Sequence, residues 1–84
     1  MKYFVCWDKT CKNYDLVLPT GFGVEVEAKK VSHARNRGWS KLKNATVAYF
    51  KNRGLLNNEK IFREYLNTLA VSVTKIENEM KKGA

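Results

Sequence analysis

Two cysteines and a single histidine are the residues best suited to metal or redox chemistry. Cys6 and Cys11 stand close together in the sequence, and His33 follows further along the chain. Structural zinc is tetrahedral and is commonly held by two closely spaced ligand pairs, and this chain lacks the second pair. A disulfide across a tight hairpin is another use of the cysteines, but free thiols are the rule in a reducing compartment. We therefore expect free thiols and no metal site.

The other groups that resemble catalytic motifs do not assemble into an active site. Glu25 and Glu27 share one face of a predicted strand, and alternation alone explains them as its solvated side. His33 has no serine, cysteine or acid in an order typical of nucleophilic catalysis. The G-x-G at 21–23 lacks the further glycine and the helix of a phosphate-binding loop, and it indicates a turn. We expect a protein that is not an enzyme and that holds no cofactor.

The distribution of charge is the most informative feature of the sequence. Residues 28–58 contain no Asp or Glu but eight of the 16 Lys and Arg residues, and we call them the acid-free segment. Because the rest of the chain holds equal numbers of basic and acidic residues, the whole formal net charge of +8 belongs to this segment. Ordinary solvated helices mix both signs, since oppositely charged i,i+4 pairs stabilise them. A segment without such pairs is typical of a surface for a polyanion or an acidic partner.

Most of these cations fall on one predicted helix, residues 31–53. Lys30, Arg37 and Lys41 cluster within about 40° of each other on one flank of its apolar stripe. Trp39 lies on the other flank, where it either packs into the core, which we favour, or stacks on unpaired bases. The apolar stripe comprises Val31, Ala34, Gly38, Leu42, Ala45 and Tyr49. The candidate binding residues are Lys29, Lys30, Arg35, Arg37, Trp39, Lys41, Lys43, Lys51 and Arg53.

Phosphate backbones reward such a helix, because each neutralised phosphate releases condensed counterions. The sequence therefore predicts a small basic module that binds DNA or RNA through the acid-free segment. The alternative is a protein-binding accessory or inhibitor of the phage type that docks on an acidic surface of a larger enzyme or nucleoprotein complex. Electrostatic steering serves both functions equally well.

Alternating residues predict three strands in the first third of the chain. They cover residues 2–8, 14–18 and 24–28, with turn residues between them. Helix 31–53 follows, with Ser32 as its N-cap and Gly54 as its C-terminal stop. Two alternatives remain open within it. In the first, the helix breaks at Gly38, which stands at helix-turn-helix spacing from Ala34. In the second, residues 45–50 form a short strand.

The last third predicts a second helix. Its seam runs from Phe62 to Met80 at spacings of three and four, through Leu66, Leu69, Val73 and Ile76. Asn57 or Asn58 can cap its start, and the β-branched run at 71–74 weakens its propensity locally. The fold class expected is α+β, a three-stranded antiparallel meander followed by an antiparallel two-helix hairpin (β-β-β-α-α). The seam of the second helix also suits a homodimer.

Length and composition predict one domain that spans residues 1–84. No apolar run reaches the length of a membrane span, and the N-terminus lacks the pattern of a signal peptide. We therefore expect a cytoplasmic protein with no membrane partner.

Overall fold

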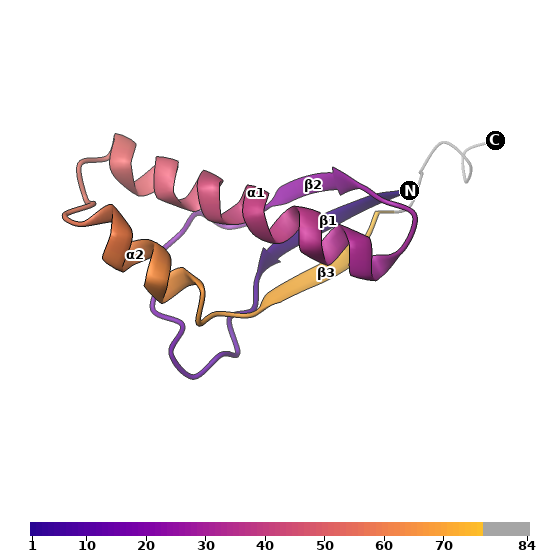
Figure 1. Ribbon diagram of the computed structural model, residues 1–84, viewed down its shortest axis with the longest axis horizontal. Helices are drawn as coiled ribbons and strands as arrows, with labels where there is room; N and C mark the ends of the chain where they lie inside the picture. Colours follow the sequence, from indigo (N-terminus) through magenta and orange to yellow (C-terminus); the bar gives the residue numbers. More distant parts are fainter. Residues whose placement is uncertain (77–84) are drawn as a thin grey trace.

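The computed structural model describes residues 1–76 of the 84-residue chain (Figure 1). Along the chain, strands β1 (Lys2–Trp7) and β2 (Val24–Glu27) precede helices α1 (Val31–Asn52) and α2 (Glu59–Leu66). Strand β3 (Val71–Lys75) comes last. The order of elements is therefore β-β-α-α-β, with the helices between the second and third strands.

The strands form one antiparallel sheet in the spatial order β2-β1-β3. Tyr3 of the central strand lies opposite Val26 on one side and Lys75 on the other. Successive side chains of a strand point to opposite faces of a sheet, so Tyr3, Val5 and Trp7 share one face. All three are buried, and this face carries the core.

Helix α1 covers the buried face of the sheet, as Figure 1 shows. Ala34 and Leu42, one turn on either side of Gly38, are fully buried beneath it. Gly38 lies directly against the isopropyl group of Val5, and a Cβ at this position would collide with that group. The absence of a side chain at Gly38 thus lets the helix approach the central strand closely.

A buried hydrogen-bond relay also ties α1 to β1. Trp7 Nε1 donates to Thr46 Oγ1 at 2.9 Å, and this hydroxyl donates to the carbonyl oxygen of Leu42 at 2.8 Å. Thr46 is fully buried, and a buried polar group without a partner is costly. The relay satisfies both polar side chains inside an otherwise apolar core.

Helix α2 packs against the C-terminal half of α1 and lies beyond the sheet (Figure 1). Phe50 of α1 meets Phe62 of α2 edge to face, with ring centroids 5.2 Å apart. On the same helix, the Tyr65 hydroxyl donates to the carbonyl oxygen of Asn13 and accepts from the amide of Asp15, both at 2.7 Å. The long loop between β1 and β2 is thereby fastened to α2.

The predicted β-β-β-α-α order is wrong at two places. The first is residues 14–18, which form an irregular stretch of the loop and not a strand. Their alternation is real, because Tyr14, Leu16 and Leu18 are half-buried while the intervening residues are exposed. Since β2 and β3 occupy both edges of β1, this segment has no place beside the central strand.

The second error is the long helix predicted from Phe62 to Met80. Helix α2 ends at Leu66, and residues 71–75, which include the β-branched run, form β3 beside β1. Leu69 and Val71 are buried, so apolar residues that fit a helical seam equally fit a strand that alternates. A helical seam for self-pairing is therefore absent between residues 69 and 75, and the last turns of the predicted helix lie outside the described residues.

Helix α1 matches the predicted helix 31–53 to within one residue at its C-terminus. It runs without a break through Gly38 and through residues 45–50, so both alternatives for this region are wrong. Its N-cap is Lys30, with no side-chain hydrogen bond, and not Ser32. Gly54 follows the helix with φ of 69°, the left-handed conformation of a C-terminal stop. Asn58 caps α2 by accepting from the amide of Ile61.

Candidate nucleic-acid interface

The cations of the acid-free segment lie along the whole of α1 and just beyond both its ends. Lys29 and Lys30 precede the helix, and Lys51 and Arg53 mark its other end. Lys43 is half-buried, and the other seven basic side chains are exposed. The predicted binding residues are therefore on the surface, but they occupy different sides of the helix.

One flank of α1 faces the edge strand β2. Arg37 Nη1 donates to the carbonyl oxygen of Glu27 at 2.8 Å, and Lys41 Nζ donates to the carbonyl oxygen of Glu25 at 3.0 Å. These carbonyls point away from β1, because the amide of Ala28 bonds across to β1 and hydrogen-bonding direction alternates along an antiparallel pair. The two cations thus cover the open edge of the sheet, where unpaired backbone groups otherwise invite another strand.

A shallow groove of about 570 Å³ runs along this flank. Lys2, Arg37 and Lys41 line it together with Glu25 and Glu27. The segment without acids in the sequence therefore borders two carboxylates in space. Sequence reasoning missed Lys2 as a member of this group, because only the register of β1 against β2 brings it there.

The other flank of α1 holds Trp39 and Lys43. Trp39 packs edge to face against Trp7, with ring centroids 6.0 Å apart, and it borders the core. Lys43 Nζ lies 5.7 Å from the centroid of the Trp39 ring and donates to Asn67 Oδ1 at 2.8 Å. A cation over an indole face is stabilised by the ring quadrupole. Trp39 is thus engaged by both an aromatic ring and a cation.

At the C-terminal end of α1 the cations contact α2 and an aromatic ring. Lys51 Nζ lies 3.8 Å from Glu59 Oε1, and Arg63 Nε donates to the other carboxylate oxygen of Glu59 at 3.0 Å. Arg53 is stacked over Tyr49, with its guanidinium carbon 4.6 Å from the ring centroid. Lys51 is the one member of the acid-free segment with an ion pair inside the described residues.

The remaining cations of the segment meet neutral groups or solvent within residues 1–76. Their contacts are backbone carbonyls, an amide oxygen and aromatic rings. None of these contacts is an ion pair, so within the described residues these cations are not neutralised by direct contact, although Glu25 and Glu27 border the groove beside Arg37 and Lys41. The start of α1 adds positive potential, because its first turn has no acidic residue and the helix dipole places partial positive charge there.

The N-terminal half of α1 presents an exposed, acid-free side, which we call the α1 ridge. At about 100° per residue its members inside the helix fall within one solvent-facing sector, and Lys29 and Lys30 stand just before the first turn. All of them are exposed, and they comprise Lys29, Lys30, His33, Asn36, Arg37, Ser40 and Lys41. Of the predicted binding residues, the ridge unites Lys29, Lys30, Arg37 and Lys41. It leaves out Arg35, Trp39, Lys43, Lys51 and Arg53.

Groups with perturbed protonation lie in the loop that follows β1. The hydroxyl and amide of Thr10 donate to Asp8 and lower the pKa of its carboxyl group. Burial raises the pKa of the Tyr14 hydroxyl. Neither residue belongs to the α1 ridge, and neither faces a cluster of catalytic groups in the described part of the chain.

The cysteines do not build a metal centre with His33. Both are free thiols, and Cys11 Sγ accepts a hydrogen bond from the amide of Ala70 at 3.3 Å. Within residues 1–76, no three His, Cys, Asp or Glu side chains come together in a way that holds a metal ion.

Among the described residues, no helix has the length and apolar character needed to cross a membrane. No family model matches this sequence, and searches of curated proteins and of solved structures find no similar protein. The function must therefore be inferred from the chemistry of the surface itself.

Proposed function

We propose that the protein binds nucleic acid, DNA or RNA, and that the α1 ridge supplies the main phosphate contacts. One observation supports this proposal most strongly. Of the eight cations of the acid-free segment, only Lys51 pairs with a carboxylate within the described residues. Cations that remain unneutralised can release counterions from a phosphate backbone, which drives binding without any reading of sequence.

The length over which the cations are spread supports a polymeric ligand. Helix α1 has 22 residues, which corresponds to about 33 Å at the rise of an α-helix. Cations occur before its first turn, along its middle and after its last turn. A small anion would need them gathered at one point, whereas a chain of phosphates engages charges distributed along a line.

The polar residues between the cations suit the same ligand. His33, Asn36 and Ser40 are exposed on the ridge, and side chains of these types donate to phosphate oxygens or contact base edges. Arg37 reaches the carbonyl of Glu27 through one nitrogen, Nη1. Guanidinium groups carry several donors, so the same side chain retains donors for a phosphate.

A protein partner is the second candidate, and a separate observation favours it. Leu55 and Ile61, at the turn between α1 and α2, are 62% and 61% exposed. Arg53 and Lys60 are exposed close to them in the sequence. Exposed apolar side chains with cations close by in the sequence suit an acidic protein surface, as a docking accessory or inhibitor requires.

The test is equilibrium binding of a labelled 20-base-pair DNA duplex by fluorescence anisotropy between 50 and 300 mM salt. With about four phosphates neutralised by the cations of the ridge, the slope of log K against log salt should be about −3.6. Between 50 and 200 mM salt this slope corresponds to a loss of about 150-fold in affinity. If neither DNA nor RNA binds at 50 mM salt, the proposal is wrong, and a pull-down after nuclease treatment becomes the test of a protein partner.

A further inference from the structure

We infer that the nucleic acid is double-stranded, an inference that rests on the proposed function. Proteins that bind single strands combine a basic groove with aromatic rings on which successive bases stack. The two modes therefore differ in one structural requirement, an exposed aromatic face beside the cations.

No aromatic side chain of this protein is exposed, and all ten lie within the described residues. Tyr3 and Trp7 are buried, with 3% exposure each. The remaining eight are half-buried. The exposed large hydrophobic residues of the described chain are aliphatic and comprise Met1, Val17, Val31, Leu55 and Ile61.

The two aromatic residues best placed for stacking are already engaged. Trp39 contacts both Trp7 and the ammonium group of Lys43. Tyr49 meets Phe22 edge to face at 5.5 Å and lies under the guanidinium group of Arg53. A base stacking on the ring face that carries the cation would have to displace a cation–π contact. Neither Trp39 nor Tyr49 belongs to the α1 ridge. A base stacked on either ring would therefore not add to the phosphate contacts of the ridge.

The face of the sheet opposite α1 offers no alternative platform. Phe4 is the aromatic residue of β1 on that face, because it alternates with the buried Tyr3 and Val5. Its cross-strand neighbour on β2 is Glu25, and its ring lies against Gly23 at the end of the loop. Phe4 lines a small pocket together with Tyr14 and Phe22, and Lys9 is the one cation in that lining. A phosphate chain passing over Phe4 would meet the carboxylate of Glu25 and be repelled.

What remains on the ridge fits a duplex. Its cations and its amide, hydroxyl and imidazole groups make contacts to backbone phosphates and to base edges in a groove, and these contacts need no unpaired base. Counterion release also favours the duplex, with a slope of about 0.9 for each phosphate contact against about 0.7 for a single strand. For about four contacts at 0.1 M salt, the difference amounts to about sixfold in affinity.

The experiment compares a labelled mixed-sequence 20-base-pair DNA duplex with each of its separated strands, at 0.1 M salt and with the full chain. We expect the duplex to bind at least about sixfold more tightly than either strand. A strand that binds as tightly as the duplex overturns the inference and leaves the proposed function standing. Absence of binding to all probes overturns both.

Tryptophan fluorescence of the same samples provides a second readout. Trp7 is buried and Trp39 is half-buried, so a stacked base would quench mainly Trp39. We expect little quenching when the protein is saturated with a single strand. Two results together would also overturn the inference. One is strong quenching by the single strand, and the other is a loss of affinity for that strand in Trp39→Phe.

Discussion

Neutralising two cations of the α1 ridge should weaken duplex binding far more than neutralising two cations elsewhere. The double variant Lys30→Gln/Lys41→Gln removes charge from both ends of the ridge. Lys30 has no side-chain capping role, and Lys41 makes one exposed hydrogen bond, to the carbonyl of Glu25. Loss of such an exposed contact costs little, so the variant should fold as the wild type does.

The expected magnitude follows from counterion release. Each lost phosphate contact reduces the slope of log K against log salt by about 0.9, and at 0.1 M salt it weakens binding by about eightfold. The double variant should therefore bind about 60-fold more weakly, with a slope of about −1.8 in place of about −3.6.

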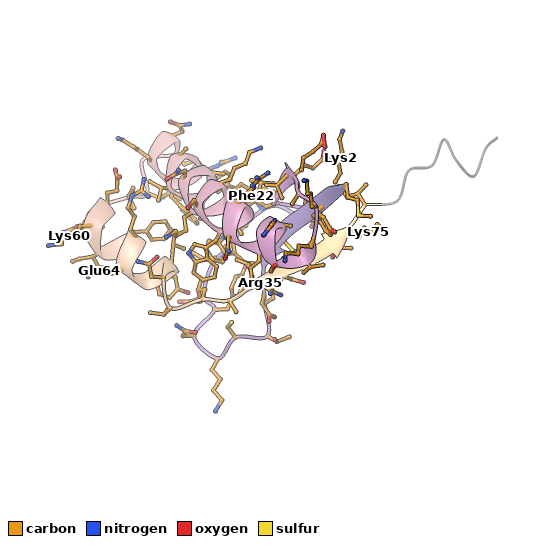
Figure 2. All side chains as sticks on the ribbon, turned by 45° about the vertical axis from the view of Figure 1, so that its right-hand side comes forward. Lys2, Phe22, Arg35, Lys60, Glu64 and Lys75 are labelled. Carbon is orange, nitrogen blue, oxygen red and sulfur yellow. The ribbon has the colours of Figure 1, made fainter. Side chains whose placement is uncertain are left out.

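The assay is anisotropy of the labelled duplex over the same salt series, with Lys12→Gln/Lys60→Gln as the matched control. Lys12 lies in the loop after β1, and Lys60 is exposed on α2, at the opposite end of the molecule from Lys2 and Lys75 (Figure 2). The control loses the same net charge from outside the ridge and should bind within about threefold of wild type, through long-range attraction alone. Equal losses in the two variants would refute the ridge as the binding surface, because affinity would then follow net charge only.

Three further perturbations test the structure around the ridge. Glu25→Gln/Glu27→Gln removes the two carboxylates that border the groove and should tighten duplex binding about threefold at 50 mM salt; unchanged or weaker binding would place the phosphates elsewhere. Thr46→Val leaves the indole N–H that donates to its hydroxyl without a partner in the core, and urea unfolding should show a loss of about 1–3 kcal/mol, whereas a neutral effect would contradict the buried relay. Gly38→Ala raises helix propensity by about 1 kcal/mol but drives a methyl group into Val5, so unfolding should show net destabilisation, and a gain in stability would contradict the close approach of α1 to β1.

Helix α1 could be predicted because its signals agree at every level. Ala34, Gly38 and Leu42 follow one helical period and are all buried, and Gly54 provides a stop that only a flexible residue adopts readily. The start of the helix was less clear, because no side chain caps it. The preference for serine as an N-cap points to Ser32, but in this protein the N-cap is Lys30.

Strand β3 was missed because its residues satisfy two periods at once. Leu66, Leu69 and Val73 continue a helical spacing, while Val71 and Val73 alternate as a strand does. The choice depends on a long-range fact, namely that β1 has an edge free to accept a partner. The β-branched run at 71–74 is the local signal for the strand, and in this chain it outweighs the helical spacing.

The sequence shows how the charges are distributed along the chain, but it does not show which opposite charges the fold brings together. Part of the acid-free segment does form one exposed surface, the α1 ridge, as the helical spacing indicates, whereas its other cations lie elsewhere on α1. Glu25 and Glu27 nevertheless border it, because β2 is an edge strand whose outward carbonyls accept from Arg37 and Lys41. Only the position of β2 in the sheet brings these opposite charges together.

The most direct test of the α1 ridge is an amide chemical-shift titration of the isotope-labelled protein with the unlabelled duplex. Binding through the ridge predicts that the largest shifts fall between Lys29 and Lys41 and grow with duplex until saturation. The amides between Leu55 and Ile61 and those of β3 should change little. Shifts centred on residues 55–61, with residues 29–41 unaffected, would contradict the account and assign the binding surface to the turn between α1 and α2.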